Sequence, residues 1–447
     1  MKYYVITYGC QMNKSDSERV ASVLKNMGYQ PVNKPAQADL IIVNMCSVRQ
    51  SAVDRVYGLG KKFNEFKKQN PNLKTALTGC ILLSDKIKLK KQFDLIFDIK
   101  NLIKLSDILC YHHVIPRSNA LEYFSIFPSS DSSVTAYVPI MTGCNNFCAY
   151  CVVPYVRGKE ISRSTLEIIE EVKKLIKKGY KQIILLGQNV NSYKDKNIDF
   201  PELLKLINDL PEKFWLYFVT SHPKDLSDKL IEVMSLGEKI AEYLHLPVQA
   251  GDNQILKQMN RGYTVEKYKK IIKKVRKKVK NINISTDIIV GFPGETKKQF
   301  IQTVKLIKWA KFDIIYTAQY SPRPMTAAFK LKDNVIKKEK KRREQILTKI
   351  LKKTALKNNR KYLNKTIEIL IEKKIKNDFY LGKTKTFKNV KIKNPKGLLK
   401  IGQFIKVKII NATPWGLEGQ IDPVRDRFSS KTVRVSFRNS ISNGVEK

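Results

Sequence analysis

The sequence predicts an α/β protein in three parts: a small N-terminal α/β sheet domain, a central partial (β/α)6 barrel and a small C-terminal β-barrel. A length of 447 residues exceeds what one hydrophobic core usually supports, which favours several domains. In the middle of the chain, six apolar strand segments alternate with amphipathic helices. After a very basic helix expected at 337–361, the pattern changes to short β-rich runs with glycine at the turns.

The N-terminal domain is expected to span residues 1–116. Its strand signals lie at 3–8, 40–43, 75–77 and 95–99. Ser15 and Glu18 have the spacing of a capping box, and Gly28 is expected to end that helix. The stretch 111–133 loses periodicity and carries Pro and a serine cluster, which is typical of a linker between domains.

The central barrel is expected within 130–360. Its strands are predicted near 135–141, 182–187, 214–219, 243–248, 284–291 and 312–319. A helix with a second capping box, Ser164 and Glu167, ends at Gly179 and supports the alternating repeat.

The small β-barrel is expected within 362–425. Its predicted strands are 366–371, 379–384, 390–392 and 404–410. Residues 426–447 are polar and aperiodic, which predicts a loosely ordered tail.

The chain is strongly basic, with 84 Lys and Arg against 40 acidic residues and a formal net charge of +44. Such an imbalance attracts polyanions, so nucleic acid is the expected partner, although a lysine-rich composition can also reflect codon bias and solvated helix faces. No apolar run is long enough for a membrane helix, and the first residues begin a strand pattern and do not resemble a signal peptide. A cytoplasmic protein with no membrane partner is therefore expected.

The strongest chemical signal is the C-x3-C-x2-C spacing of Cys144, Cys148 and Cys151, directly after the first predicted barrel strand. Barrel active sites gather at the C-terminal ends of the strands. Three thiolates on one loop can hold three irons of a [4Fe-4S] cluster and leave the fourth iron open to another ligand. Zinc is the alternative, but a structural zinc site usually takes a fourth ligand from a second Cys or His pair, and none follows.

Cys10, Cys46 and Cys80 each lie near the end of a predicted strand of the N-terminal domain. Parallel strands would bring the three together at the edge of the sheet where ligands bind, which favours a second cluster. The alternative is that each is a small core residue. Cys110, the seventh cysteine, is expected to pack on an apolar helix face without a chemical role.

The combined motifs resemble the radical S-adenosylmethionine methylthiotransferase family. The resemblance extends over nearly the whole chain and rests on the motifs TYGCQMN, VNMCSVR, LTGC, TGCNNFCAYCVVPYVRGKEISR, HLPVQ, MNRGYT and STDIIVGFPGET. The segment LLGQNVNSY resembles the family member that makes 2-methylthio-N6-isopentenyladenosine. Relatives that modify threonylcarbamoyladenosine, or an aspartate of a ribosomal protein, differ in this segment.

The resemblance implies a transferase with two [4Fe-4S] clusters and S-adenosylmethionine as cofactors. It implies that Cys10, Cys46 and Cys80 hold an auxiliary cluster and that Cys144, Cys148 and Cys151 hold the radical cluster. One S-adenosylmethionine would methylate a sulfur at the first cluster. A second would be cleaved at the other to a deoxyadenosyl radical that activates C2 of the adenine, because the C2–H bond resists ordinary acid–base chemistry.

Less specific residues are candidates for further contacts. Tyr150 matches the aromatic position before the last ligand of the Cys motif. Gln188 and Asn189 follow the second barrel strand and are candidates for contacts to cofactor or base, with a turn as the competing explanation. Gly291 and Gly294 could let the backbone approach the cofactor, or could simply shape a turn before Glu295, whose charge would suit a helix start.

The C-terminal barrel is similar to the TRAM module, an RNA-binding domain, so the anticodon arm of tRNA is the expected partner. Its candidate phosphate contacts are Lys373, Lys374, Lys383, Lys385, Lys388 and Lys391. A small electron-donor protein and a monomeric enzyme are also expected. The functional alternatives are methylthiolation of threonylcarbamoyladenosine in tRNA, and a non-catalytic RNA-binding protein that carries metal.

Two segments depart from the family pattern. The chain reads Ala250-Gly251-Asp252 where Ser-Gly-Ser is usual, and Met325 occupies a glycine position beyond the sixth strand. Because that glycine suits a backbone with φ above zero, Met325 puts the local loop geometry in question.

Overall fold

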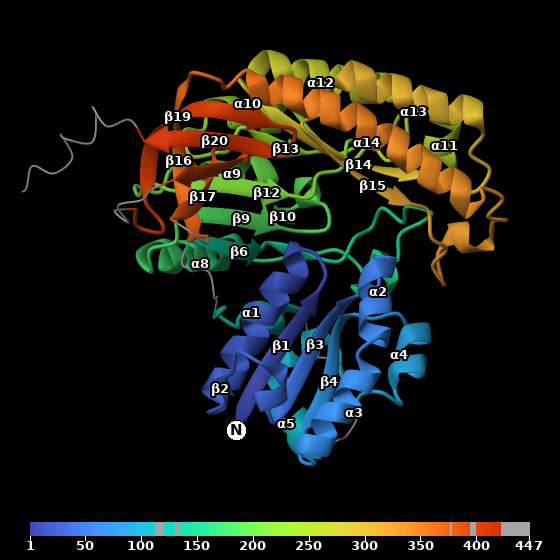
Figure 1. Ribbon diagram of the computed structural model, residues 1–447, viewed down its shortest axis with the longest axis vertical. Helices are drawn as coiled ribbons and strands as arrows, with labels where there is room; N and C mark the ends of the chain where they lie inside the picture. The colour runs from blue at the N-terminus through green and yellow to red at the C-terminus, as the bar shows by residue number, and fades with distance from the viewer. Residues whose placement is uncertain (112–119, 130–133, 376–377, 394–398, 422–447) are drawn as a thin grey trace, which may run out of the picture.

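The computed structural model describes residues 1–111, 120–129, 134–375, 378–393 and 399–421. They form an N-terminal sheet domain, a half-open barrel above it and a small closed barrel at one end (Figure 1). The predicted fold class is confirmed in each part. The predicted tail 426–447 lies outside the described residues.

The N-terminal domain is a parallel sheet with strand order β2-β1-β3-β4-β5. Its strands are β1 (Lys2–Tyr8), β2 (Gln30–Pro31), β3 (Leu40–Cys46), β4 (Lys74–Cys80) and β5 (Leu95–Ile96). Its helices are α1 (Gln11–Asn26), η1 (Pro35–Gln37), α2 (Gln50–Tyr57), α3 (Gly60–Gln69), α4 (Leu83–Leu89), η2 (Ile99–Lys104), α5 (Leu105–Tyr111) and α6 (Ala120–Phe124). Apolar side chains fill both faces of the sheet, one against α1 and the other against α2 and α3.

Two local expectations for this domain were wrong. The first helix begins at Gln11, so Ser15 lies inside it, and the Ser15 hydroxyl accepts a hydrogen bond from Arg19 and does not cap the helix. Part of the expected linker is ordered as α6, because Tyr123 and Phe124 are buried in the core of the domain.

The central barrel has six parallel strands in two hydrogen-bonded halves, β12-β9-β6 and β13-β14-β15, joined by a bridge between Leu216 and Ile240. Its main strands are β6 (Thr135–Pro139), β9 (Gln182–Leu186), β12 (Trp215–Val219), β13 (Tyr243–His245), β14 (Asn283–Val290) and β15 (Ile314–Gln319). All six correspond to predicted segments. Short strands also occur at β7 (Met141–Thr142), β8 (Ile161–Ser162), β10 (Lys194–Asp195) and β11 (Ile198–Asp199).

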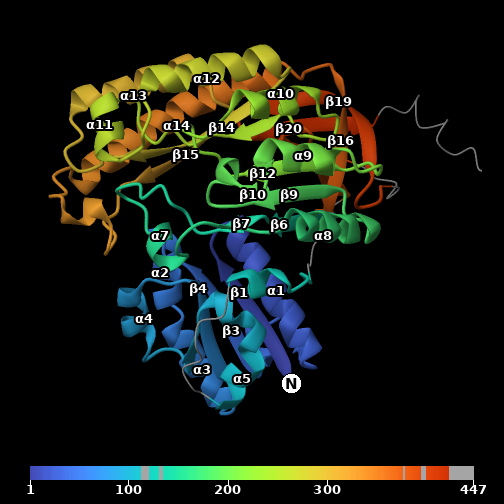
Figure 2. The same ribbon diagram turned by 180° about the vertical axis from the view of Figure 1, so that it is seen from behind.

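The helices of this part are α7 (Val153–Val156), α8 (Thr165–Lys177), η3 (Val190–Ser192), α9 (Phe200–Asn208), α10 (Asp228–Leu236), α11 (Asn253–Gln258), α12 (Val265–Lys278), α13 (Lys297–Ala310), η4 (Ala327–Lys330) and α14 (Lys337–Arg360). Helices such as α8, α9, α10, α12 and α13 lie along the outside of the half-barrel, as Figure 2 shows from behind. Ser164 does precede α8, but its side chain makes no capping hydrogen bond. The carboxylate of Asp195 accepts from the Thr165 amide in its place, at 2.6 Å.

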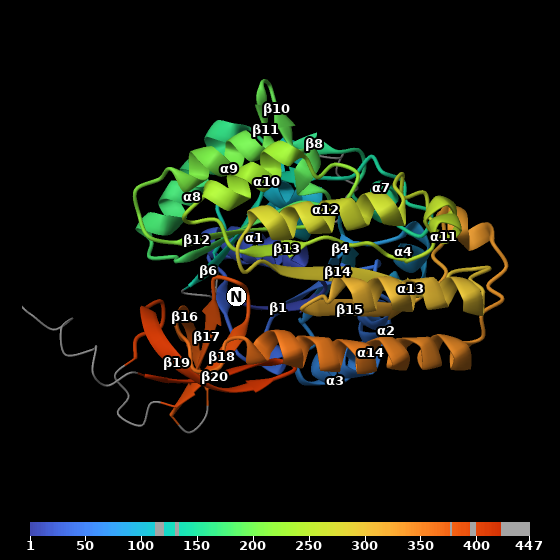
Figure 3. The same ribbon diagram turned by 90° about the horizontal axis from the view of Figure 1, so that it is seen from above.

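The C-terminal domain is a closed barrel of five strands with order β16-β17-β18-β20-β19. They are β16 (Thr366–Lys374), β17 (Phe379–Thr384), β18 (Asn389–Lys393), β19 (Phe404–Thr413) and β20 (Gly416–Ile421). Seen from above, α14 runs along the half-barrel and ends beside this domain (Figure 3). Leu370, Phe387 and Phe404 pack with Tyr217 and Tyr243, so the small barrel covers part of the inner wall of the half-barrel.

None of the described helices combines the length and the apolar character needed to cross a membrane.

Candidate active site

The cysteines of the N-terminal domain meet at the carboxyl edge of its sheet. Cys10 follows β1 and is the N-cap of α1, while Cys46 and Cys80 are the last residues of β3 and β4 and are paired in register. In the sheet, β2 lies on one side of β1 and β3 lies on the other side. The strand order therefore reverses at β1, which Cys10 follows. Open α/β sheets bind ligands at such a point.

Burial shapes the chemistry of these thiols. Burial raises the pKa of Cys80 to about 12, and burial together with the neighbouring Cys10 raises the pKa of Cys46. The Arg157 guanidinium partly offsets the effect on Cys80, because its Nε donates a hydrogen bond to Cys80 Sγ at 2.9 Å. A positive hydrogen-bond donor on the sulfur favours the thiolate, which is the form of cysteine that binds a metal.

Arg157 also links the two domains. Its second guanidinium nitrogen lies 2.6 Å from Asp16 Oδ2 on α1, and Tyr123 donates to the other oxygen of that carboxylate. Arg157, Asp16 and Tyr123 are all buried. The loop that carries the second cysteine group is therefore bonded directly to the wall of the first.

Cys144, Cys148 and Cys151 lie on the loop between β7 and β8, at the C-terminal side of the half-barrel. The backbone turns tightly, since Cys151 N donates to Cys148 O at 2.9 Å. Two donors point at the sulfurs: Arg261 Nη1 lies 3.2 Å from Cys148 Sγ, and Asn146 Nδ2 lies 3.5 Å from Cys144 Sγ. Burial raises the pKa of Cys151 to about 12, so an unliganded thiol here stays protonated.

Within the described residues, no three or more His, Cys, Asp or Glu side chains are close enough together to hold one metal ion. In a [4Fe-4S] cluster each thiolate binds a different iron. The three sulfurs that bind a cluster therefore surround a common space and do not meet at one point. In both cysteine groups an arginine donates a hydrogen bond to one of the sulfurs.

Beside the second cysteine group, five buried side-chain atoms have no hydrogen-bond partner among the described residues. They follow β9 and β12, at the same end of the barrel as the cysteine loop. They are Gln188 Oε1, Asn189 Oδ1, Asn191 Nδ2, Ser221 Oγ and His222 Nε2. Because each such atom costs about 1–3 kcal/mol when unpaired, their concentration in one place indicates a binding site for a polar ligand.

The His222 ring is neutral, and its Nε2 is a hydrogen-bond donor. Burial, reinforced by Arg261 and Lys224, lowers the pKa of His222 to about 2. Its Nδ1 accepts from the Lys224 amide at 3.2 Å, so the ring proton lies on Nε2. Asn189 is fixed by bonds from its Nδ2 to Asp225 and Ser192, which leaves Oδ1 as the acceptor.

Tyr150, predicted to contact the cofactor, lies in this neighbourhood. Its hydroxyl accepts from Arg261 at 3.4 Å, the same guanidinium that reaches Cys148. Its role toward a cofactor stays a prediction.

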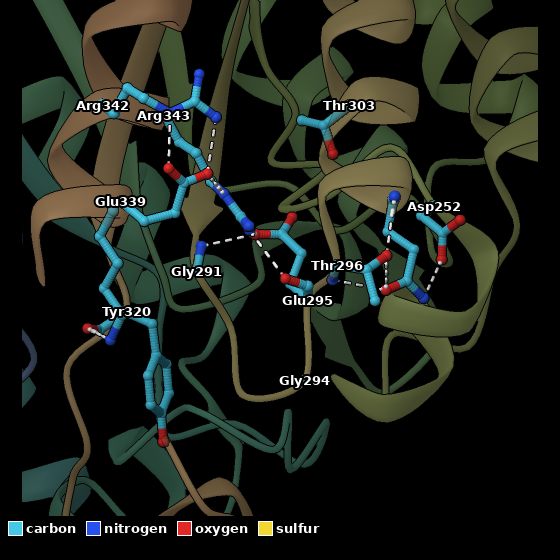
Figure 4. Close-up of polar contacts among 12 residues, drawn as sticks. Asp252, Gly291, Gly294, Glu295, Thr296, Thr303, Tyr320, Glu339, Arg342 and Arg343 are labelled. Atoms are coloured by element: carbon cyan, nitrogen blue, oxygen red, sulfur yellow. Dashed lines mark hydrogen bonds and ion pairs between the residues drawn. The ribbon is translucent and has the colours of Figure 1, made fainter. Parts of the chain in front are cut away.

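Gly291 and Gly294 adopt left-handed backbone conformations, with φ of 70° and 82°. Figure 4 shows the Glu295 carboxylate between the Gly291 amide and the Arg343 guanidinium, each at 2.7 Å. The Gly294 amide donates to Asn334. Both amides are therefore used inside the protein, and Glu295 is part of a buried ion pair that fixes the loop after β14.

The structure explains Asp252, whereas nothing in it explains a methionine at position 325. Asp252 caps α11, since its Oδ1 accepts from the amides of Gln254 and Ile255. Met325 has φ of 70°, as predicted for a position that suits glycine, and its side chain is exposed.

Three of the six lysines proposed for phosphate contacts are engaged within the protein. Lys388 is buried against Asp313 at 2.9 Å, Lys385 pairs with Glu242, and Lys383 pairs with Glu372. Lys388 and Lys385 attach the small barrel to the half-barrel, whereas Lys383 and Glu372 both belong to the small barrel. The buried position of Lys388 contradicts its predicted phosphate contact, while for Lys385 and Lys383 that contact stays a prediction. Lys373, Lys374 and Lys391 are exposed.

Lys388→Met is expected to lower the free energy of unfolding by about 2–4 kcal/mol, because Asp313 loses its buried partner. Lys391→Met is the matched control and should leave the free energy of unfolding unchanged. It should weaken RNA binding and reduce the slope of log Kd against log salt concentration by about 1. Thermal unfolding and RNA titration at several salt concentrations measure both effects. Equal stability of the two variants would contradict a stabilising role for the buried ion pair of Lys388 and Asp313.

Sequence reasoning missed the arginines around the cysteines, Arg157 and Arg261, and also Arg343. The basic motifs contained them, but nothing in the sequence distinguished them from surface charges. Cys110 was also misjudged, since it is exposed and not packed in the core.

Three family models match the chain: the uncharacterized protein family UPF0004 over residues 2–98, the radical SAM superfamily over 138–307 and the TRAM domain over 360–421. Among solved structures, a radical S-adenosylmethionine methyltransferase, TsrM from Kitasatospora setae, has a TM-score of 0.55 and 12% identity, covering 73% of this chain and 77% of that chain. The cobalamin-dependent S-adenosylmethionine radical enzyme OxsB has a TM-score of 0.53 and 12% identity, covering 80% and 56%. These structures share the fold.

Curated relatives match nearly end to end. The tRNA-2-methylthio-N(6)-dimethylallyladenosine synthase of Clostridium botulinum (strain Langeland) is 42% identical over 438 residues, 94% of this chain and 96% of the relative. The synthase of Carboxydothermus hydrogenoformans is 42% identical over 435 residues, 93% and 98%. The predicted resemblance is thus confirmed, and the chain belongs to the family of tRNA-2-methylthio-N(6)-dimethylallyladenosine synthases, which are radical S-adenosylmethionine enzymes with [4Fe-4S] clusters.

Proposed function

We propose that this enzyme methylthiolates C2 of N6-isopentenyladenosine next to the anticodon of tRNA. The observation that carries the proposal is 42% identity to synthases of this name across 94% of the chain. The TRAM domain supports tRNA as the partner. When bound, the clusters and S-adenosylmethionine supply the methylthio group and the radical that activates the C2–H bond.

We propose that Cys10, Cys46 and Cys80 hold the auxiliary cluster and that Cys144, Cys148 and Cys151 hold the radical cluster. Each group lies at the C-terminal edge of parallel strands, and each has an arginine donor on one sulfur. Arg157 and Arg261 would balance the negative charge of the bound thiolates. The Arg157 link to Asp16 would keep the two clusters at a fixed separation.

We propose that the unpaired polar atoms after β9 and β12 bind S-adenosylmethionine. Gln188 Oε1 and Asn189 Oδ1 are acceptors suited to its ammonium group, whereas His222 Nε2 and Asn191 Nδ2 are donors suited to hydroxyl or carboxylate oxygens. The set lies beside the Cys148 loop through Tyr263, whose ring contacts His222 and whose hydroxyl accepts from Arg261.

Gln188→Leu is expected to raise the Kd for S-adenosylmethionine about 10-fold or more, because a hydrogen bond to a charged group is lost. Isothermal titration of the reconstituted protein measures this. Gln420→Leu, on the exposed surface of β20, is the matched control and should bind as the wild type does. An unchanged Kd for Gln188→Leu would remove this residue from the cofactor site.

We propose limits of 130–360 and 362–425 for the central and C-terminal domains, and an N-terminal domain that extends past the predicted limit of 116 to include α6. We also propose a small electron-donor protein as a partner, a monomeric state and a cytoplasmic location. The cysteine loop has exposed aromatic side chains, Phe147 and Tyr155, that would give a donor access to the radical cluster.

The test of the function uses an anticodon stem-loop RNA that carries N6-isopentenyladenosine, incubated anaerobically with reconstituted enzyme, S-adenosylmethionine and dithionite. A methylthio mass increment on that nucleoside is expected. An increment only on threonylcarbamoyladenosine RNA would contradict the proposed substrate.

A further inference from the structure

On the inner wall of the half-barrel, Tyr316, Asp287 and His245 form a polar aromatic surface that the cluster and cofactor proposals do not use. The strands place them side by side: His245 pairs with Ser285, and Asp287 pairs with Tyr316, in parallel register. The opposite face of β15 packs outward, where Ile315 joins the core that contains Leu347 of α14. The three residues therefore share the face that lines the barrel interior.

One hydrogen bond and one longer polar contact hold His245 in the inner part of this surface. His245 Nδ1 lies 2.8 Å from Ser285 Oγ, and its Nε2 lies 3.4 Å from Asp287 Oδ2. The Tyr316 ring stands edge-on to the His245 ring at 5.8 Å. His245 is thus held as a support, while its two neighbours remain accessible.

The side chains of Tyr316 and Asp287 are partly exposed to solvent although they line the barrel. Tyr316 is 49% exposed, and the side chain of Asp287 is 35% exposed. Within the part of the chain that the structure describes, His245 is the one polar side-chain contact of the Asp287 carboxylate. An aromatic face beside an available carboxylate is the combination that binds an unstacked nucleobase, through stacking and an edge hydrogen bond.

The surface lies between the two cysteine groups. Toward one of them, Pro247 and Val248, just beyond His245, accept hydrogen bonds from Arg261 and Tyr263, and Arg261 touches Cys148. Toward the other, β15 is the edge of the barrel nearest α2 in Figures 1 and 3, and Ser321 Oγ lies 3.5 Å from Gln50 Oε1.

The lower part of the barrel interior is filled. Tyr243 stacks on Phe387 of the small barrel at 4.5 Å, with Tyr217 against the same ring. A base that enters between the domains would therefore stop at the level of Tyr316.

We infer that Tyr316 and Asp287, supported by His245, form the receiving surface for the target adenine after it leaves the RNA stack. This inference rests on the proposed function. Tyr316 stacks on the base, and the Asp287 carboxylate accepts the single N6–H of isopentenyladenine. The base is thereby held between the two cysteine groups. C2 must be accessible there both to the radical and to the methylthio sulfur.

The test compares reconstituted wild type with Tyr316→Ala, Tyr316→Leu, Tyr316→Phe and Leu236→Ala, the last on the outer helix α10. KM and kcat for the isopentenyladenosine stem-loop are measured, together with iron content and RNA-independent deoxyadenosine formation. Tyr316→Ala and Tyr316→Leu should raise KM about 10- to 100-fold, because stacking is lost, while Tyr316→Phe and Leu236→Ala stay near wild type. Iron content and RNA-independent deoxyadenosine formation should match the wild type in all variants.

Tyr316→Leu keeps an apolar side chain, so it remains informative if Tyr316→Ala fails to fold. A KM within twofold of wild type for Tyr316→Leu, with an active wild type, would overturn the receiving surface alone. A wild type that forms no methylthio product but cleaves S-adenosylmethionine would instead overturn the proposed function, on which this inference depends.

Discussion

Gly143→Ala is expected to abolish most radical chemistry while leaving the rest of the protein folded. Gly143 precedes Cys144 and has φ of 81°. An added Cβ would overlap the carbonyl group of Lys159 and lie 2.6 Å from the carbonyl oxygen of Gly158, so the cysteine loop would have to move. A shift of the order of 1 Å at a reacting centre costs about 100-fold in rate.

Dithionite-dependent deoxyadenosine formation and iron content measure this effect. The matched control is Gly179→Ala, which has a similar φ of 97° but nothing within 4 Å of the added Cβ. That variant carries only backbone strain of about 1–2 kcal/mol and should retain iron and activity. Equal losses in both variants would show that strain alone, and not the close approach at the cysteine loop, is responsible.

Arg157→Met is expected to destabilise the protein by about 3–5 kcal/mol and to reduce the iron held by the N-terminal domain. The substitution leaves the Asp16 carboxylate fully buried without its cation and removes the donor to Cys80. Thermal unfolding and iron analysis of the reconstituted protein provide the measurement.

Two controls separate the causes. Arg342→Met removes an arginine that pairs with Glu339 at the surface and should change stability little. Adding Asp16→Asn to Arg157→Met removes the uncompensated charge and should recover part of the stability but not the iron. Full recovery of iron in the double variant would contradict a direct role of Arg157 at Cys80.

The sequence predicted much of the architecture because strand periodicity is local. All six barrel strands were found, and the positions of Cys10, Cys46 and Cys80 after their strands were enough to predict that they converge. Strands β2, β8, β10, β11 and β20 were missed. The first four have two residues each, and β20 contains Gly416 and Gly419, which weaken the β signal.

The buried ion pairs could not be predicted, since their partners are distant in sequence. Arg157 and Asp16 are 141 positions apart, and Arg343 and Glu295 are 48 apart. Likewise, net charge did not show which lysines face solvent, because Lys388 has the same side chain as Lys391 but lies against Asp313. Pairing across domains depends on docking, which the charge pattern of a single sequence does not record.

The most direct test of two clusters that serve radical chemistry is anaerobic iron and sulfide analysis of reconstituted wild type beside a variant with Cys144, Cys148 and Cys151 replaced by alanine. Deoxyadenosine formation is followed in both. We expect about eight irons in the wild type, about four in the variant, and deoxyadenosine from the wild type alone. Zinc in place of iron, or deoxyadenosine from the variant, would contradict the account.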